Sequence, residues 1–395
     1  MSEETVVHGS GASSVEADPS GPEKPVTWAE LFFDLVFVVA ITKMSTLVGY
    51  DHSWSGLLRA LIVFVPVYWL WVGTSIQTNL ADTSRASLHL RIFAVALAGV
   101  FMALAVSDVY GGEGMMFAAA YWAGRLVLGA AFVHRSGRRI TVPLNGFSVA
   151  MVVTGPLLVV GALAHGDARE VLWAAAAVID LATPSVLRSR LASLQFNAGH
   201  LTERFGLFVL IALGESVVSV GTLAPNGSLT AGQASSVAAA FVLACGLWWT
   251  YFHFAADAMR HSLATARVQV DITRLVLSYG HLSFIAAIIA VAVGLRESIA
   301  QPGQHLTWAV TGLLFGGTAL YLATFGFTRW AMFRLVSYTR LTTAAVVLAL
   351  LPVAPNVPAL ASLILLAGVL AALNIFELVR NNQSGWLARK HSGRA

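Results

Sequence analysis

Long runs of apolar residues, separated by short polar connections, occupy most of the chain from residue 25 onward. The stretches 60–81, 147–164 and 306–328 contain no Asp, Glu, Lys or Arg, and each is close to the roughly 20 residues that a helix needs to cross a bilayer. The longer uncharged run 341–376 is divided by prolines, which interrupt helices. This pattern predicts an all-α, polytopic transmembrane helix bundle of about twelve spans. The predicted spans are centred near residues 38, 68, 99, 123, 156, 178, 212, 246, 285, 317, 345 and 367.

Basic residues alternate between the two sides of the predicted spans. Arginines gather in every second connection, whereas the other connections hold only Arg169 and Arg296, with Lys43 and Arg59 near helix ends. Because Lys and Arg accumulate in cytoplasmic loops, both termini are expected in the cytoplasm. The arginines of the predicted cytoplasmic connections are Arg85, Arg91, Arg135, Arg138, Arg139, Arg188, Arg190, Arg204, Arg260, Arg267, Arg274, Arg329, Arg334 and Arg340.

Composition narrows the classes of protein that remain. Hydrophobic residues make up 57% of the 395 residues and charged residues only 11%, with a mean hydropathy of +0.74, which excludes a soluble globular protein. The net charge of +4 lies in short loops, so nucleic acid is not expected as a partner. Cys245 is the single cysteine, which excludes a disulfide scaffold and a thiolate metal site. Residues 1–24 predict a disordered cytoplasmic tail without the features of a signal peptide, and 381–395 a cytoplasmic C-terminal tail.

The chain shows signs of an internal repeat. Residues 25–190 would hold spans 1–6 and residues 200–380 spans 7–12, in the same orientation. Such parallel repeats are related by an axis along the membrane normal. Chance similarity between hydrophobic helices is the alternative explanation. The matching features are Glu30-Leu31-Phe32 with Glu203-Arg204-Phe205, Arg91 with Arg274, Pro156 with Pro352, Asp180 with Asn374, and the aromatic clusters at 68–71 and 248–251.

Ionisable residues inside the predicted spans are few, and such residues are usually paired or functional because burying charge in hydrocarbon is unfavourable. Most of them lie in the cytoplasmic half or at mid-depth, as either a cytoplasm-facing polar cavity or a salt-bridge network would require. The candidates for a substrate, ion or proton pathway are Glu30, Asp34, Arg125, Asp180, Glu203, Glu215 and His281.

Arg125 needs a partner, because its guanidinium stays charged. Asp34, Asp180 and Glu215 are the candidate carboxylates. At least one carboxylate among them is left over, and it would be protonated or would bind a proton or cation during function. Glu215 follows Gly214, which allows a helix or ligand to approach closely.

The other candidates have ordinary structural explanations. Glu30 and Glu203 lie in the first turns of their predicted helices, where a carboxylate also suits the helix dipole, and capping is the favoured explanation. His281 is expected to form a helix–helix hydrogen bond rather than to carry a proton. His253 and Asp257 would need a third partner to bind metal, so no metal or other cofactor is expected. The sequence contains no motif typical of a soluble enzyme, and the chain is expected not to be an enzyme.

Five short motifs occur along the predicted spans. They are Glu30-Leu-Phe-Phe-Asp34-Leu-Val-Phe37, Gln77-Thr-Asn79-Leu-Ala-Asp82, His200-Leu-Thr-Glu203-Arg204-Phe205-Gly206-Leu-Phe, Leu213-Gly214-Glu215-Ser216 and Tyr279-Gly280-His281-Leu. These motifs resemble those of the LtrA family, the bacterial low temperature requirement A proteins. The resemblance covers about residues 25–380, with Glu30, Phe33, Asp34, Glu203, Arg204, Gly214, Glu215 and His281 at motif positions. It implies a multi-pass protein of the bacterial cytoplasmic membrane, linked by name to growth in the cold, and it supplies no established substrate.

A second resemblance concerns architecture only. The first-helix motif and the six-plus-six repeat are similar to the two-repeat lysosomal and bacterial potassium channels. Those channels have serine before the aspartate, whereas this chain has Phe33.

Three functions follow from these observations. The first is a secondary transporter of an unidentified small solute or ion, with or without proton coupling, in which Asp34 and Glu215 are the titrating groups and Arg125 is their counter-ion. The second is an ion channel lined by spans 1 and 7. The third is a sensor, enzyme or assembly factor that transports nothing and whose buried charges hold the bundle together. The lipid bilayer is the one partner that the sequence predicts, and it leaves the oligomeric state open.

Overall fold

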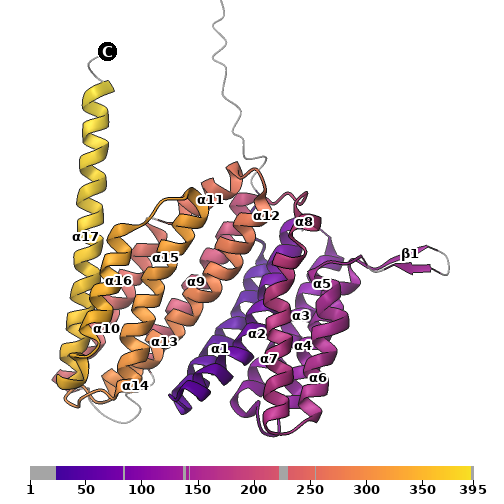
Figure 1. The fold of residues 1–395 in the computed structure, drawn as a ribbon, viewed down its shortest axis with the longest axis horizontal. Coiled ribbons are helices and arrows are strands. Elements are labelled where there is room, and N and C mark those ends of the chain that lie inside the picture. The colour runs from indigo at the N-terminus through magenta and orange to yellow at the C-terminus, as the bar shows by residue number, and fades with distance from the viewer. Residues whose placement is uncertain are drawn as a thin grey trace, which may run out of the picture.

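The computed structural model describes residues 24–82, 85–136, 139–141, 143–221, 230–253 and 255–392. The tail predicted for residues 1–24 therefore lies outside the described residues, apart from Lys24. The chain forms a bundle of long helices with one small antiparallel hairpin that projects from its side (Figure 1). The hairpin consists of β1 (His134–Ser136) and β2 (Arg139–Thr141).

The N-terminal half of the bundle contains six long helical segments. They are α1 (Trp28–Tyr50), α2 (Trp54–Leu80), α3 (Ala86–Ala105), α4 (Gly114–Ala130), the continuous segment α5 (Gly146–Val149), η2 (Ala150–Thr154) and α6 (Gly155–Leu163), and α7 (Asp167–Val186). Short pieces follow α3 and α7, namely η1 (Val106–Asp108) and α8 (Arg188–Leu191).

The C-terminal half also contains six. They are α9 (Ala198–Gly221), α10 (Ala231–Phe252), the segment α12 (Gln269–Ile272), η3 (Thr273–Gly280) and α13 (His281–Ala300), the segment α14 (Trp308–Thr311), η4 (Gly312–Gly316) and α15 (Gly317–Phe333), α16 (Tyr338–Leu350), and α17 (Ala359–Ser392). Short pieces are α11 (Ala256–Thr265) and η5 (Ala354–Asn356). The segments η2, η3 and η4 are π-helical.

A helix lies at each of the twelve predicted centres. Within the described residues, nine helices are long and apolar enough to cross a membrane. The long helices α4, α7 and α9, each at a predicted span centre, are not among these nine, and α4 has only 17 residues. The multi-pass helical class is therefore confirmed, while the number twelve stays a prediction.

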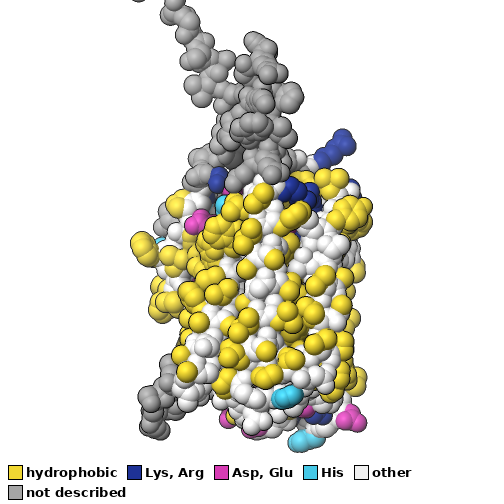
Figure 2. Space-filling model, turned by 90° about the vertical axis from the view of Figure 1, so that its left-hand side faces the viewer, with side chains coloured by type: hydrophobic (Ala, Val, Ile, Leu, Met, Phe, Trp, Pro, Cys, Tyr) yellow, Lys and Arg dark blue, Asp and Glu magenta, His cyan; other side chains and the backbone are white. Residues whose placement is uncertain are grey.

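The surface agrees with a membrane environment. Figure 2 shows hydrophobic side chains covering the flank of the bundle, with Lys and Arg side chains gathered mainly toward its upper end. Large apolar side chains on the long helices are accordingly exposed, among them Leu97 at 58% and Ile364 at 56%. A lipid-facing flank explains this exposure, because contiguous apolar surface of this extent is rare on soluble monomers.

Within each half, the helices contact one another in the same order. In the first half α1 packs on α2 and α3, α3 on α4, α4 on α6, α6 on α7, and α7 on α2. In the second half α9 packs on α10 and α13, α13 on α15, α15 on α16, α16 on α17, and α17 on α10. Figure 1 shows the two sets side by side. The halves meet where α1 and α2 pack against α9, and α1 against α13.

Candidate functional site

Four charged or titratable side chains lie together where α1 meets α9. Glu30 and Asp34 of α1 face His200 and Arg204 of α9, and none of the four is more than 2% exposed. Arg204 Nη1 donates to Asp34 Oδ2 at 2.9 Å, and His200 Nε2 lies 3.1 Å from Glu30 Oε1. Arg204 Nε lies 4.0 Å from the same Glu30 oxygen. We call these four residues the ionic cluster.

The residues of the ionic cluster come together because each helix presents two of them one turn apart. Glu30 and Asp34 are separated by four positions, as are His200 and Arg204, and side chains with this spacing share one helical face. Glu30 also closes a capping box, in which its carboxylate accepts from the backbone N–H of Thr27 and the Thr27 hydroxyl accepts from the backbone N–H of Glu30. Glu30 therefore caps α1, as predicted, and also contacts α9.

Helix α2 completes the ionic cluster from a third side. Trp71 donates its indole N–H to Asp34 Oδ1 at 2.8 Å, and Arg204 Nη2 donates to the Ser75 hydroxyl at 3.4 Å. The guanidinium of Arg204 also lies 5.6 Å from the centre of the Trp71 ring, within the range of a cation–π contact. Asp34 thus accepts hydrogen bonds from two different helices.

Hydrogen bonds around Asn79 determine the proton position on His200. The backbone N–H of Asn197 donates to Asn79 Oδ1, so the Asn79 amide nitrogen points the other way, toward His200 Nδ1 at 3.1 Å. An N–H donor requires Nδ1 to accept, so the proton of His200 sits on Nε2 and is donated to Glu30. His200 is therefore neutral in this arrangement, and the ionic cluster holds two carboxylates against one guanidinium.

Lys24 lies just before α1, beside the ionic cluster. Its Nζ donates to the carbonyls of Thr78, Asn79 and Ala81 at 2.6, 3.1 and 2.6 Å, and so closes the C-terminal end of α2. Partial burial lowers the pKa of Lys24 from its ordinary value, and the nearby carboxylate of Glu30 acts in the opposite direction.

A second polar contact joins α1 and α9 farther along the two helices. The Thr42 hydroxyl donates to Glu215 Oε2 at 2.5 Å, and Glu215 is 4% exposed. Aromatic rings lie between this contact and the ionic cluster, with Trp71 stacked on Phe208 at 4.2 Å between ring centroids and Phe37 at 6.2 Å from Phe208. We call these three rings the aromatic layer.

Arg125 is not the counter-ion of Asp34 or Glu215. Its Nη2 lies 3.8 Å from Asp180 Oδ2, one of the three predicted partners, and Arg204 takes the place expected for it beside Asp34. The physical reason is position in the bundle, since Arg125 and Asp180 lie on α4 and α7 of the N-terminal half, away from the contact of α1 with α9. Asp180 also accepts from the hydroxyls of Thr154, at 3.0 Å, and Tyr121.

Two further candidates lie outside these groups. Glu203 is exposed on α9, and it lines a surface cavity together with Lys24 and Asp257. The predicted capping role is wrong for Glu203, because α9 begins at Ala198 and Glu203 lies beyond its first turn. His281 is fully buried, with Nε2 2.6 Å from the Tyr251 hydroxyl and Nδ1 3.0 Å from the Val276 carbonyl. This is a helix–helix hydrogen bond between α13 and α10, as expected for His281.

Sequence reasoning missed His200 as a site residue and included Arg204 only as part of a motif. The signal that could have found both is the pair of complementary four-residue spacings, acidic on the first helix and basic on the seventh. Glu203 lies between them in sequence but on another face of α9. No group of three or more His, Cys, Asp or Glu side chains that could hold a metal occurs within the described residues.

Comparison with known proteins places most of the helical region in one family. The family model for the bacterial low temperature requirement A protein (LtrA) matches residues 25–375. A curated relative from Rhizobium meliloti (strain 1021), described as an uncharacterized protein, is 28% identical over 364 residues, which cover 89% of this chain and 89% of the relative. No solved structure matches the chain.

Proposed function

The chain belongs to the family of bacterial low temperature requirement A proteins, and we propose that it is a secondary transporter in which proton binding at the ionic cluster accompanies solute movement. One observation carries this proposal. Two carboxylates and one guanidinium, with a neutral histidine, are buried where helices of the two halves meet. The nearby cation Lys24 is only partly buried and donates to three backbone carbonyls, so the buried groups themselves hold an excess negative charge, which favours uptake of a proton.

The proposed topology has twelve spans in two parallel six-helix halves, with both termini on the cytoplasmic side of the cell membrane. The support is the matching order of helix contacts in the two halves. Figure 1 also draws the start of α1 and the end of α17 toward the same end of the bundle. In this arrangement α1 corresponds to α9, and the ionic cluster lies beside the axis that relates the halves.

Asp34 is the proposed proton acceptor. Glu30 accepts from the backbone and hydroxyl of Thr27 and faces His200, whereas Asp34 depends on Trp71 and Arg204. Protonation of Asp34 would remove the charge that holds Arg204 and so weaken the link between α1 and α9. The two halves could then move relative to each other, which a transporter with alternating access requires.

The aromatic layer gives this proposal a closed state. Trp71, Phe37 and Phe208 fill the space between the ionic cluster and Glu215, so the two polar regions are separated by packed rings. Glu215 is the proposed second proton or cation site, reached when the contact of α1 with α9 opens.

The test uses purified protein in liposomes with a trapped pH-sensitive dye and imposed gradients of protons, potassium, sodium or impermeant alkyl sulfonates. We expect at least one gradient to drive proton movement, and Asp34→Asn to reduce it roughly tenfold or more, because a carboxamide cannot bind the proton. Glu377→Gln is the matched control, since Glu377 is a buried carboxylate paired with Arg340 outside the ionic cluster.

The alternatives predict different results. Folded protein that responds to no gradient contradicts the transporter and favours a sensor or assembly role. Large single-channel currents that do not depend on pH favour a channel.

A further inference from the structure

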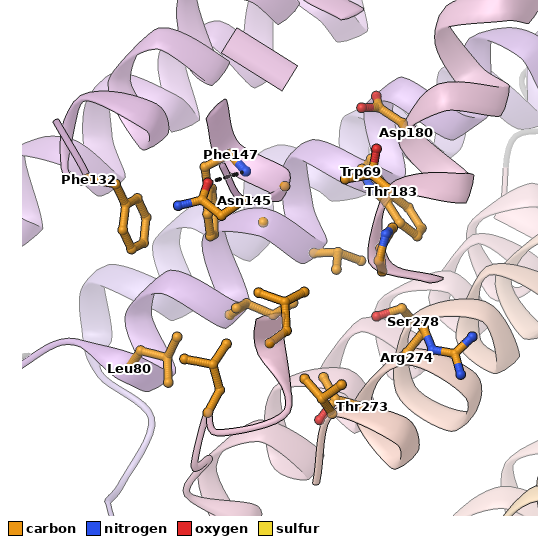
Figure 3. Close-up of a pocket in the computed structure, with 18 of the residues that line it drawn as sticks. Trp69, Leu80, Phe132, Asn145, Phe147, Asp180, Thr183, Thr273, Arg274 and Ser278 are labelled. Atoms are coloured by element: carbon orange, nitrogen blue, oxygen red, sulfur yellow. Dashed lines mark hydrogen bonds between the residues drawn. The ribbon is translucent and has the colours of Figure 1, made fainter. Parts of the chain in front are cut away.

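A cavity of about 360 Å³ lies between α2, α4, α7 and η3, apart from the ionic cluster. Its volume is at the lower end of the roughly 300–1,000 Å³ of small-molecule sites. Figure 3 shows Asp180 and Thr183 on one side, Phe132, Asn145 and Phe147 on another, and Arg274 and Ser278 on a third.

The buried end of the cavity contains a guanidinium whose hydrogen bonds are incomplete. Arg125 is 2% exposed, and among the described residues neither its Nε nor its Nη2 has a hydrogen-bond partner. Asp180 does not satisfy these donors, because it lies 3.8 Å away and already accepts from Tyr121 and Thr154. Unmet buried donors are unfavourable, so this end of the cavity suits a ligand that brings acceptor oxygens.

The charges around the cavity favour an anion with a single negative charge. Arg125 and Arg274 line it together with one carboxylate, Asp180. Asp271 pairs with Arg274 at 3.5 Å and also with Arg188 at 2.5 Å. Counting Asp271 and Arg188 as well adds one charge of each sign, so the excess of one positive charge remains. The Thr273 hydroxyl, another lining group, also has no hydrogen-bond partner among the described residues.

The remaining wall is apolar. It is made by Trp69, Ile76, Leu80, Phe132, Phe147 and Val270. Leu80 is 37% exposed, whereas Trp69 is 7% exposed, so the apolar wall runs from the surface inward to Arg125. This shape fits one acyl chain, and the volume is too small for a phospholipid with two.

We propose that this cavity binds an amphipathic monoanion, an acidic head group with one acyl chain of medium length, whose head lies against Arg125. This names a substrate class for the proposed transporter and so rests on that function, but the site itself is tested by binding, which requires no transport.

The experiment is calorimetric titration of octanoate at pH 8 into full-length protein in lipid nanodiscs, with empty nanodiscs as the blank. Octanol supplies the chain without the charge, and acetate the charge without the chain. We expect saturable octanoate binding. Octanol and acetate should each bind roughly tenfold more weakly or worse than octanoate, because octanol lacks the charge and acetate lacks the chain. Equal binding of octanol and octanoate would overturn the anion site.

Three variants locate the site. Arg125→Gln should weaken octanoate binding roughly tenfold or more. Arg125→Gln with Asp180→Asn should stay weak, although the net charge of the cavity is again that of wild type. Leu80→Trp should also weaken binding by narrowing the outer part of the cavity. Arg340→Gln, which removes a buried arginine of the C-terminal half, should bind as wild type does. Restored binding in the folded double variant would overturn the assignment to Arg125.

The two proposals fail separately. Octanoate binding in a protein that moves no protons would contradict the proposed transporter function and support the binding site. Proton-coupled transport of another solute, with no octanoate binding, would contradict the binding site and support the transporter function.

Discussion

Asn79 presents its amide nitrogen to His200 Nδ1 at 3.1 Å, and the opposite nitrogen of the imidazole faces Glu30. A carboxamide on α2 therefore decides which imidazole nitrogen on α9 carries the proton, although it touches neither carboxylate of the ionic cluster. The backbone of Asn197 holds the carboxamide in this orientation.

Replacement of Asn79 by Leu should destabilise the protein without changing its overall charge. The backbone groups of Asn197 and the Nδ1 of His200 would lose their partner inside the bundle, and an unsatisfied buried polar group costs about 1–3 kcal/mol. Thermal unfolding in detergent should show a lower Tm than for Asn356→Leu, which removes an exposed carboxamide. An unchanged Tm would mean that the hydrogen bonds of Asn79 to Asn197 and His200 do not stabilise the bundle.

Removal of Arg204 should be among the most damaging single changes. Arg204→Ala leaves Glu30 and Asp34 buried without their cation, and breaking a buried ion pair from one side costs about 3–5 kcal/mol. Arg59→Ala breaks the pair with Glu170, which is partly exposed, and should cost about 0–1 kcal/mol. Unfolding free energies of the two variants should differ accordingly. Adding Asp34→Asn to Arg204→Ala should recover part of the loss, and a further loss would contradict the proposed charge balance.

Gly73 of α2 controls the position of Arg125. A Cβ at Gly73 would lie 2.9 Å from Arg125 Nη1 and 3.3 Å from a Leu128 methyl, so the guanidinium must shift. Gly73→Ala should therefore weaken octanoate binding severalfold while preserving the helix, since Ala favours helix over Gly by about 1 kcal/mol. Titration of Gly303→Ala, which has open space around the added methyl, provides the comparison. Equal octanoate affinities of Gly73→Ala and Gly303→Ala would mean that the position of Arg125 does not matter for binding the head group.

Thinning the aromatic layer should let protons pass without solute. Phe208→Leu removes the ring stacked on Trp71, between the ionic cluster and Glu215. Proteoliposomes should show proton leak above wild type in the absence of a driving solute. Phe376→Leu, at an exposed position on α17, should show none. A Phe208→Leu variant that leaks no more protons than wild type would mean that the closed state depends on other residues.

The positions of the helices could be predicted from the sequence because hydrophobic length is a local property. Apolar runs bounded by arginines predict a helix wherever a bilayer must be crossed, and a helix lies at each predicted centre. The short amphipathic α11, the β1–β2 hairpin and the π-helical segments were not expected, since none of them carries a pattern of that length.

The pairing of charges could be predicted only in part. Arg125 was expected beside one of three carboxylates, and the hypothesis that it neutralises Asp34 and Glu215 was wrong. Choosing among carboxylates requires knowing which helices touch, and that depends on packing between residues far apart in the sequence. The four-residue spacings of Glu30 with Asp34 and of His200 with Arg204 are local, so they could have been read from the sequence.

Two of the three π-helical segments adjoin the cavity: η2 carries Thr154, which bonds Asp180, and η3 carries Thr273, Arg274 and Ser278. A π turn holds an extra residue, and its relaxation to α-helix turns one side of the helix by about 100° relative to the other. Such a step in η3 would swing Arg274 off the cavity wall while α13 kept its place. The cavity could then release a bound anion by rewinding one helix, with the two halves of the bundle at rest.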